Sequence, residues 1–210
     1  RLDRDSLQQP RAKFAMHGAN QVLRAGLLRD GRAVYEFMRG DGYWGPIGEA
    51  ATAEGIADSL TERFLDRLVY REGICVFYTH LGKVGRSACP FTPATQEAFR
   101  RLAQYAADNQ ILVLTTHRLL RYVTTRNSLR YRAETENNTT VIKVQGIDDP
   151  VYGLQGSDSG DLEGVTFEAP QCEHVRIETS DGTEIPCRIA RENDVCLATI
   201  DWPRLTFPAL

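Results

Sequence analysis

The sequence predicts an α/β part in residues 1–130, built from alternating strands and helices, and a small all-β part in residues 131–210. Before residue 130, three short apolar runs alternate with helical patterns. After it, short alternating segments are separated by turn residues. A chain of 210 residues is long enough for one large domain or two small ones. The change of pattern near residues 126–132 favours two.

Buried strands are predicted for the apolar runs 33–38, 74–79 and 111–115. A helix is predicted over 53–70, where apolar residues recur every four positions from Ile56 to Leu68. Thr92-Pro93 supplies an N-cap hydroxyl and a proline at the first helical position, so a second helix is predicted over 92–107. A last short helix is predicted to begin at Thr116. Strands that are apolar on both faces and alternate with helices favour a parallel sheet, with the three strands as neighbours.

The first 32 residues give the weakest pattern. The spacing of Phe14, Val22, Leu23 and Leu27 indicates a helix that ends at Asp30-Gly31. The sequence starts at Arg1, with neither a methionine nor the pattern of a signal peptide. The start is therefore interpreted as a cut, a processing site or an incomplete sequence, and localisation stays open.

The second part is predicted to be sandwich-like. Strand candidates lie at 131–134, 140–144, 165–167, 175–178 and 195–200, and a Gly/Asp/Ser-rich stretch spans 153–164. In 175–178 we expect Val175 and Ile177 to face the core, and Arg176 and Glu178 to face solvent. Three apolar residues near the C-terminus are expected to cover an apolar edge or the contact with the first part: Trp202, Leu205 and Phe207.

Composition excludes several classes of function. A net charge of −3 gives no electrostatic support for nucleic-acid binding. The longest apolar runs have the length of strands, so no membrane span is expected. The five cysteines form no C-x-x-C pair, which argues against a structural zinc site, and their odd number forms no disulfide framework. A single bridge among the last three cysteines stays open.

Polar side chains follow each predicted strand of the first part. Glu36 and Arg39 lie at the end of the first strand, Tyr78 and His80 at the end of the second, and His117 at the end of the third. In parallel α/β sheets, ligands bind at the C-terminal ends of the strands, so these side chains would converge on one rim. His17 and His174 are isolated in the sequence and are interpreted as structural or surface residues.

Three residues are the candidates for a site. His80 can give or take a proton near neutral pH, or it is a hydrogen-bonded structural histidine. Arg39 binds a carboxylate, or it is a solvated loop residue. Trp44, in Gly-Tyr-Trp-Gly-Pro, stacks on a sugar face, or it packs its loop onto the body of the domain.

The segment 73–122 resembles a known family. It reads Gly-Ile-Cys-Val-Phe-Tyr-Thr-His-Leu-Gly-Lys, then Phe-Thr-Pro-Ala-Thr-Gln-Glu-Ala-Phe, then Ile-Leu-Val-Leu-Thr-Thr-His-Arg-Leu-Leu-Arg-Tyr. It is similar to the closing part of polysaccharide deacetylase-like (NodB-homology) domains. The resemblance implies the last βα units of a distorted, here incomplete, parallel β/α barrel. It also implies removal of acetyl groups from sugars by a divalent metal such as zinc, bound by one Asp and two His.

His80 is the residue that the resemblance carries over, as the general acid of a hydrophobic-x-His motif. Arg39 and Trp44 would correspond to the family's middle motifs. The motif here is Tyr-Thr-His instead of Leu-x-His, and no His-x-x-x-His pair occurs. The pair Asp148-Asp149 lies in the β part, before Pro150. No metal ligand or cofactor is therefore assigned to this chain.

Three hypotheses remain. The chain is the C-terminal portion of a carbohydrate deacetylase whose metal and base residues lie upstream, and N- or O-deacetylation then needs that missing N-terminal part. It is, alternatively, a non-catalytic carbohydrate-binding or scaffolding relative. A third hypothesis is an unrelated small α/β protein with a β extension. The first two expect a carbohydrate or polysaccharide as partner, and the resemblance is compatible with an extracytoplasmic location.

Overall fold

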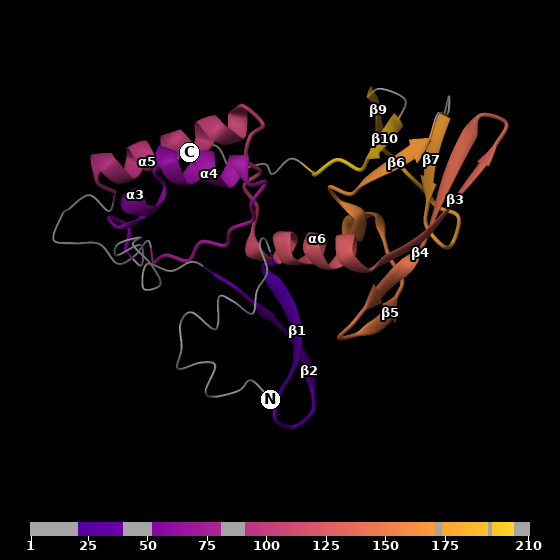
Figure 1. The fold of residues 1–210 in the computed structure, drawn as a ribbon, viewed down its shortest axis with the longest axis horizontal. Helices are drawn as coiled ribbons and strands as arrows, with labels where there is room; N and C mark the ends of the chain where they lie inside the picture. The colour runs from indigo at the N-terminus through magenta and orange to yellow at the C-terminus, as the bar shows by residue number, and fades with distance from the viewer. Residues whose placement is uncertain (1–20, 40–51, 81–90, 171–173, 193–194, 204–210) are drawn as a thin grey trace. The chain divides into compact units, whose positions relative to one another are not determined.

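A computed structural model describes residues 21–39, 52–80, 91–170, 174–192 and 195–203. Helices and strands are mixed, and the strands form several sheets, as the sequence predicts at this coarse level (Figure 1). The chain divides into two compact units, residues 1–116 and 117–210. Residues 117–130, which the sequence placed with the first part, thus belong to the second unit.

A β-hairpin opens the described part of the first unit. Strand β1 (Leu23–Leu27) pairs antiparallel with β2 (Ala33–Phe37). The turn between them contains Gly31 at φ 85°, a conformation that glycine adopts without a steric penalty. The helix predicted for residues up to Leu27 is therefore wrong, and so is the parallel pairing predicted for 33–38. Asp30-Gly31 reverses the chain, so two adjacent segments pair with each other.

Three helices follow in the described part of the first unit: α3 (Ile56–Ser59), α4 (Glu62–Tyr70) and α5 (Pro93–Ala107). The single helix predicted over 53–70 is split because Thr61 is extended, and its hydroxyl accepts a hydrogen bond from the Phe64 N–H. Thr92 caps α5 in the same way, which confirms its predicted start. Buried side chains from the three helices share one core: Ile56, Leu60, Leu65 and Ala98.

The strands predicted for 74–79 and 111–115 are absent. In this region the described residues form an isolated parallel bridge between Thr52 and His80. Leu112 and Val113, predicted to be buried on both faces, are 57% and 51% exposed. An apolar run becomes a strand only where a neighbouring strand completes its hydrogen bonds, and the described residues provide none for these two runs.

Helices α4 and α5 are also linked by a phenol–carboxylate hydrogen bond. The Tyr105 hydroxyl donates to Asp66 Oδ1 over 2.5 Å. This bond, with the negative charge of Asp66, raises the pKa of Tyr105 from 10 to about 12. The folded state therefore holds the phenol proton more tightly than the unfolded chain does. The stabilisation is complete below pH 10 and disappears as the pH rises through 12.

We expect Tyr105 to titrate near pH 12, above its ordinary value of 10. NMR spectroscopy of ring-labelled tyrosine measures this directly. Asp66→Asn removes the carboxylate charge and is expected to return the titration of Tyr105 toward 10. If Tyr105 titrated at the same pH in the parent chain and in Asp66→Asn, the hydrogen bond would have no effect on the pKa of the phenol.

The second unit begins with helix α6 (Thr116–Ser128), which is followed by strands in two sheets (Figure 1). One sheet has the order β3-β4-β7-β8, with β5 also paired to β4; the other has the order β6-β10-β9. All pairs are antiparallel except β4 with β7. The bounds are β3 Leu129–Glu136, β4 Thr139–Asp149, β5 Gly153–Gln155, β6 Thr166–Pro170, β7 His174–Glu178, β8 Glu184–Ile185, β9 Arg188–Glu192 and β10 Val195–Thr199, with a 3₁₀ turn η1 at Ser159–Leu162.

Both sheets contribute to one core. Ile142 and Ile177 come from the first sheet, and Phe167 and Ala198 come from the second. In β7, Ile177 is buried and Arg176 is exposed, as predicted, and Val175 and Glu178 are half-buried. The tail residues Leu205 and Phe207 lie outside the described residues.

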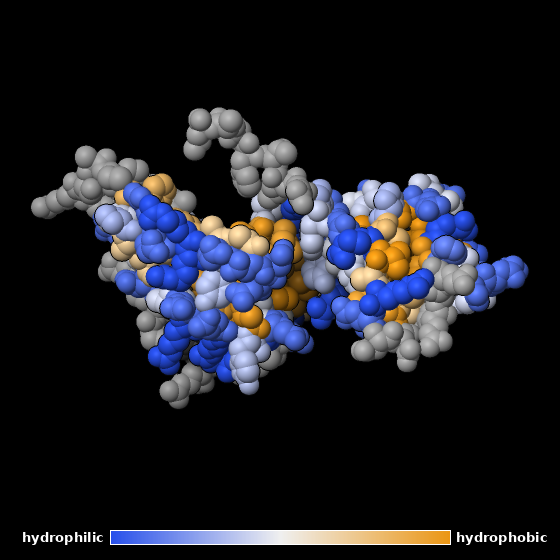
Figure 2. Space-filling model, turned by 90° about the horizontal axis from the view of Figure 1, so that it is seen from above, coloured by the Kyte–Doolittle hydropathy of each residue, from blue (hydrophilic) through white to orange (hydrophobic). Residues whose placement is uncertain are grey.

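The surface mixes hydrophilic and hydrophobic areas (Figure 2). Several large apolar side chains are exposed in each unit, among them Phe37, Leu112, Val113, Tyr131 and Leu154. Among the described helices, none combines the length and the hydropathy needed to cross a bilayer.

Candidate functional site

His80 lies at the end of an extended segment, where its ring is held by Tyr78. The Tyr78 hydroxyl and His80 Nε2 are 3.0 Å apart, and the two rings meet edge to face with centroids separated by 4.8 Å. Among the described residues, His80 Nδ1 has no hydrogen-bond partner. One ring nitrogen is thus engaged and the other can meet a ligand.

Arg39 reaches the same place from the end of β2. Its guanidinium carbon lies 4.2 Å from the centroid of the Tyr78 ring, within the range of a cation–π contact. The structure therefore brings together two of the predicted site residues, Arg39 and His80, with Tyr78 between them. This linking role of Tyr78 was not predicted from the sequence. Its signal is the spacing of two residues from His80, which puts both side chains on one side of an extended chain.

Two threonine hydrogen bonds anchor this segment to the helices. The Thr79 hydroxyl donates to the Thr52 carbonyl over 3.2 Å, next to the bridge between Thr52 and His80. The buried Thr95 hydroxyl of α5 donates to the Ala53 carbonyl over 2.8 Å. His80 is consequently tied to the start of the helical core. We refer to Arg39, Tyr78 and His80 as the His80 cluster.

The remaining sequence candidates lie elsewhere. Trp44 is outside the described residues. Glu36, at the end of β2, forms an ion pair of 2.8 Å with Arg24 across the hairpin. His117 is in the second unit, on the first turn of α6.

The described residues do not fit the metal that the family resemblance implies. No three His, Cys, Asp or Glu side chains within the described ranges lie together as a metal site. His80 Nε2 is already engaged with Tyr78. Burial raises the pKa of the Cys75 thiol to about 11, so its metal-binding thiolate form is disfavoured.

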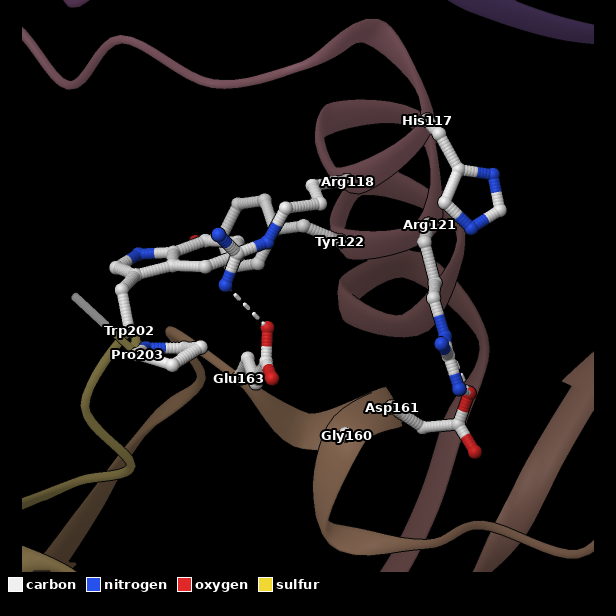
Figure 3. Close-up of a pocket in the computed structure, with 9 residues that line it drawn as sticks. All are labelled: His117, Arg118, Arg121, Tyr122, Gly160, Asp161, Glu163, Trp202 and Pro203. Atoms are coloured by element: carbon white, nitrogen blue, oxygen red, sulfur yellow. Dashed lines mark hydrogen bonds and ion pairs between the residues drawn. The ribbon is translucent and has the colours of Figure 1, made fainter. Parts of the chain in front are cut away.

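A second candidate site is a pocket of about 350 Å³ in the second unit. It lies between α6, the η1 turn and the segment after β10 (Figure 3). Its lining comes from three separated parts of the chain: His117, Arg118, Arg121 and Tyr122; Gly160, Asp161 and Glu163; and Trp202 and Pro203. The volume is at the lower end of the range of about 300–1,000 Å³ for small-molecule sites.

Two ion pairs connect α6 to the η1 turn in this pocket. Arg118 Nη2 lies 2.7 Å from Glu163 Oε2, and Arg121 Nε donates to Asp161 Oδ1 over 2.7 Å (Figure 3). Asp161 is fixed in turn by a reciprocal capping box with Asp158.

Trp202 forms the aromatic wall of the pocket. Its ring centroid is 5.3 Å from that of Tyr122 and 5.5 Å from the guanidinium carbon of Arg118. Its indole also lies against the backbone of Gly164. The sequence named Trp202 only as a covering residue, because no local pattern links it with α6.

The chain was compared with known proteins at three levels. No family model, curated protein or solved structure matches it. The geometry of the two sites therefore carries the functional argument.

Proposed function

We propose that this chain is a carbohydrate-active protein of the polysaccharide deacetylase type, and that the His80 cluster contacts the acetylated sugar. The observation that carries the proposal is the contact of Arg39 and His80 through Tyr78. The two residues lie at the ends of two segments that are far apart in the sequence. Their meeting at one point in the first unit supports a common role.

In this proposal, His80 transfers a proton to the leaving group. When the acyl C–N or C–O bond of an acetylated sugar breaks, the proton of an imidazolium nitrogen passes to the leaving amine or alkoxide. Tyr78 orients the ring through Nε2, so that Nδ1 faces the substrate. Arg39 supplies guanidinium N–H donors to sugar oxygens. The proposal assigns no residue of this chain to the attack of water.

The finer fold is also a proposal. Closing βα units of a distorted barrel would contain α4 and α5, and the absence of strands at 74–79 and 111–115 counts against such units. Two sheets around one core support a sandwich-like arrangement for residues 131–210.

Binding is tested by NMR titration of the isotope-labelled chain with chitotriose and with an acetylated xylooligosaccharide. We expect both sugars to shift the resonances of Arg39, Tyr78 and His80. His80→Gln is expected to weaken this binding about two- to tenfold, the loss of one or two ordinary hydrogen bonds. The control is His174→Gln, an exposed histidine of β7. Sugar binding that leaves the resonances of Arg39, Tyr78 and His80 unshifted would contradict the proposal. An equal loss of affinity in His174→Gln would contradict it as well.

A turnover assay separates the enzyme from its non-catalytic alternative. Acetate release from the same sugars is measured with added Zn²⁺ or Co²⁺. Release that a chelator abolishes and His80→Gln slows would support the proton-transfer role. Binding at the cluster without release would identify a non-catalytic carbohydrate-binding relative.

A further inference from the structure

We infer that the pocket of the second unit is a separate binding site for a small neutral polyhydroxylated ligand of the saccharide class. The ligand would contact Arg121, Glu163 and the aromatic wall of Tyr122 and Trp202. This inference goes beyond the proposed function, because it concerns residues of the second unit and does not depend on His80.

The charge of the pocket selects a neutral ligand. The lining arginines, Arg118 and Arg121, are balanced by the lining carboxylates, Glu163 and Asp161. An anion such as phosphate would meet two carboxylates, and an ammonium ion would meet two guanidinium groups. A ligand without charge encounters neither repulsion.

The hydrogen-bonding capacity of the pocket matches hydroxyl groups. Glu163 uses Oε2 for Arg118, and among the described residues its Oε1 has no partner. Arg121 uses Nε and Nη2 for its carboxylates, and its Nη1 has no partner within the same ranges. Two neighbouring hydroxyls of a ligand can serve both atoms, because a hydroxyl can donate and accept hydrogen bonds. One hydroxyl donates to Glu163 Oε1, and the other accepts from Arg121 Nη1.

The polar groups are held before a ligand arrives. The Arg118 and Glu163 side chains are only 17% and 27% exposed, and Arg118 lies over the Trp202 ring. The capping box fixes Asp161, which holds Arg121. Groups that are already ordered lose little side-chain entropy on binding.

The aromatic wall provides the apolar side of the site. Tyr122, Trp202 and Pro203 line the pocket beside Arg118 and Glu163, and Arg121 and Asp161 lie away from them (Figure 3). A sugar ring presents C–H groups on one face and hydroxyls around its edge, so it suits one apolar wall and one polar wall. Small-molecule sites in general combine apolar lining with a few placed polar groups.

The test is an NMR titration of the full chain with four probes: chitotriose, xylotriose, trigalacturonate and inorganic phosphate. We expect a neutral sugar to shift the Trp202 indole N–H and the amides of Arg121 and Glu163. Glu163→Gln keeps the shape of the side chain and is expected to weaken this binding about tenfold, as for a hydrogen bond to a charged group. Glu134→Gln is the matched control, since Glu134 forms an ion pair with Lys143 in the same unit and outside the pocket.

Thermal melting and the dispersion of the NMR spectrum show whether the Glu163 variant remains folded. If it does not, Arg121→Gln tests the other polar partner. Pocket shifts that persist in His80→Gln would support this inference even if the His80 cluster bound no sugar. Absence of pocket shifts with both neutral sugars, stronger binding of phosphate or trigalacturonate, or equal weakening in Glu134→Gln would overturn it.

Discussion

Gly164→Ala is expected to destabilise the second unit by about 2–5 kcal/mol. A Cβ at this position would lie 2.1 Å from Trp202 Cε2, and φ is +79°. Overpacking of this kind costs about 1–3 kcal/mol. The left-handed backbone conformation adds about 1–2 kcal/mol for any residue with a Cβ. Both effects act at once, because the indole has no space to move without leaving Tyr122 and Arg118.

Urea denaturation followed by circular dichroism measures this loss, with Gly153→Ala as its control. Gly153 has nearly the same φ, +76°, but no heavy atom within 4 Å of its Cβ position. The control is therefore expected to show only the backbone cost. Trp202→Ala should remove the extra cost of Gly164→Ala in the double variant. Equal destabilisation by Gly164→Ala and Gly153→Ala would show that Trp202 does not press on this glycine in solution.

Ile177→Ala is expected to destabilise the second unit by about 2–5 kcal/mol. Ile177 is 0% exposed and is paired with Ile142 across the parallel contact of β7 with β4. Its truncation leaves a cavity in the core shared by both sheets. Ile177→Val removes one methylene and should cost about 0.5–1.5 kcal/mol.

The matched control for this series is Ile189→Ala on β9, which is 40% exposed. The lost apolar contact is smaller there, so the midpoint of urea denaturation should move much less. A similar shift for Ile177 and Ile189 would contradict the placement of Ile177 in the core.

The sequence predicts elements well where local chemistry determines them. Thr92 and Pro93 start α5, and Asn109, at φ 56°, lies just after its end, in the conformation expected of a helix stop. The predictions of strands at 74–79 and 111–115 are wrong for the opposite reason. A strand depends on its neighbour, and the apolar composition of Leu112 and Val113 carries no information on whether a neighbour is present.

The same distinction applies to the two sites. Arg39 and His80 could be predicted because each follows an apolar run, whereas their contact through Tyr78 depends on the tertiary structure. The pocket of the second unit was not predicted. Arg121, Glu163 and Trp202 come from separate segments, and only the packing of the chain joins them.

The outer position of β3 bears on how copies of this protein behave at high concentration. In the described residues β3 pairs only with β4, so its other side presents free backbone groups to which an identical chain could add a strand. Exposed charged side chains line this strand: Arg130, Arg132, Glu134 and Glu136. An identical strand added in register would place like charges side by side, which is unfavourable. The charged side chains of β3 therefore disfavour amyloid-like growth from its open side.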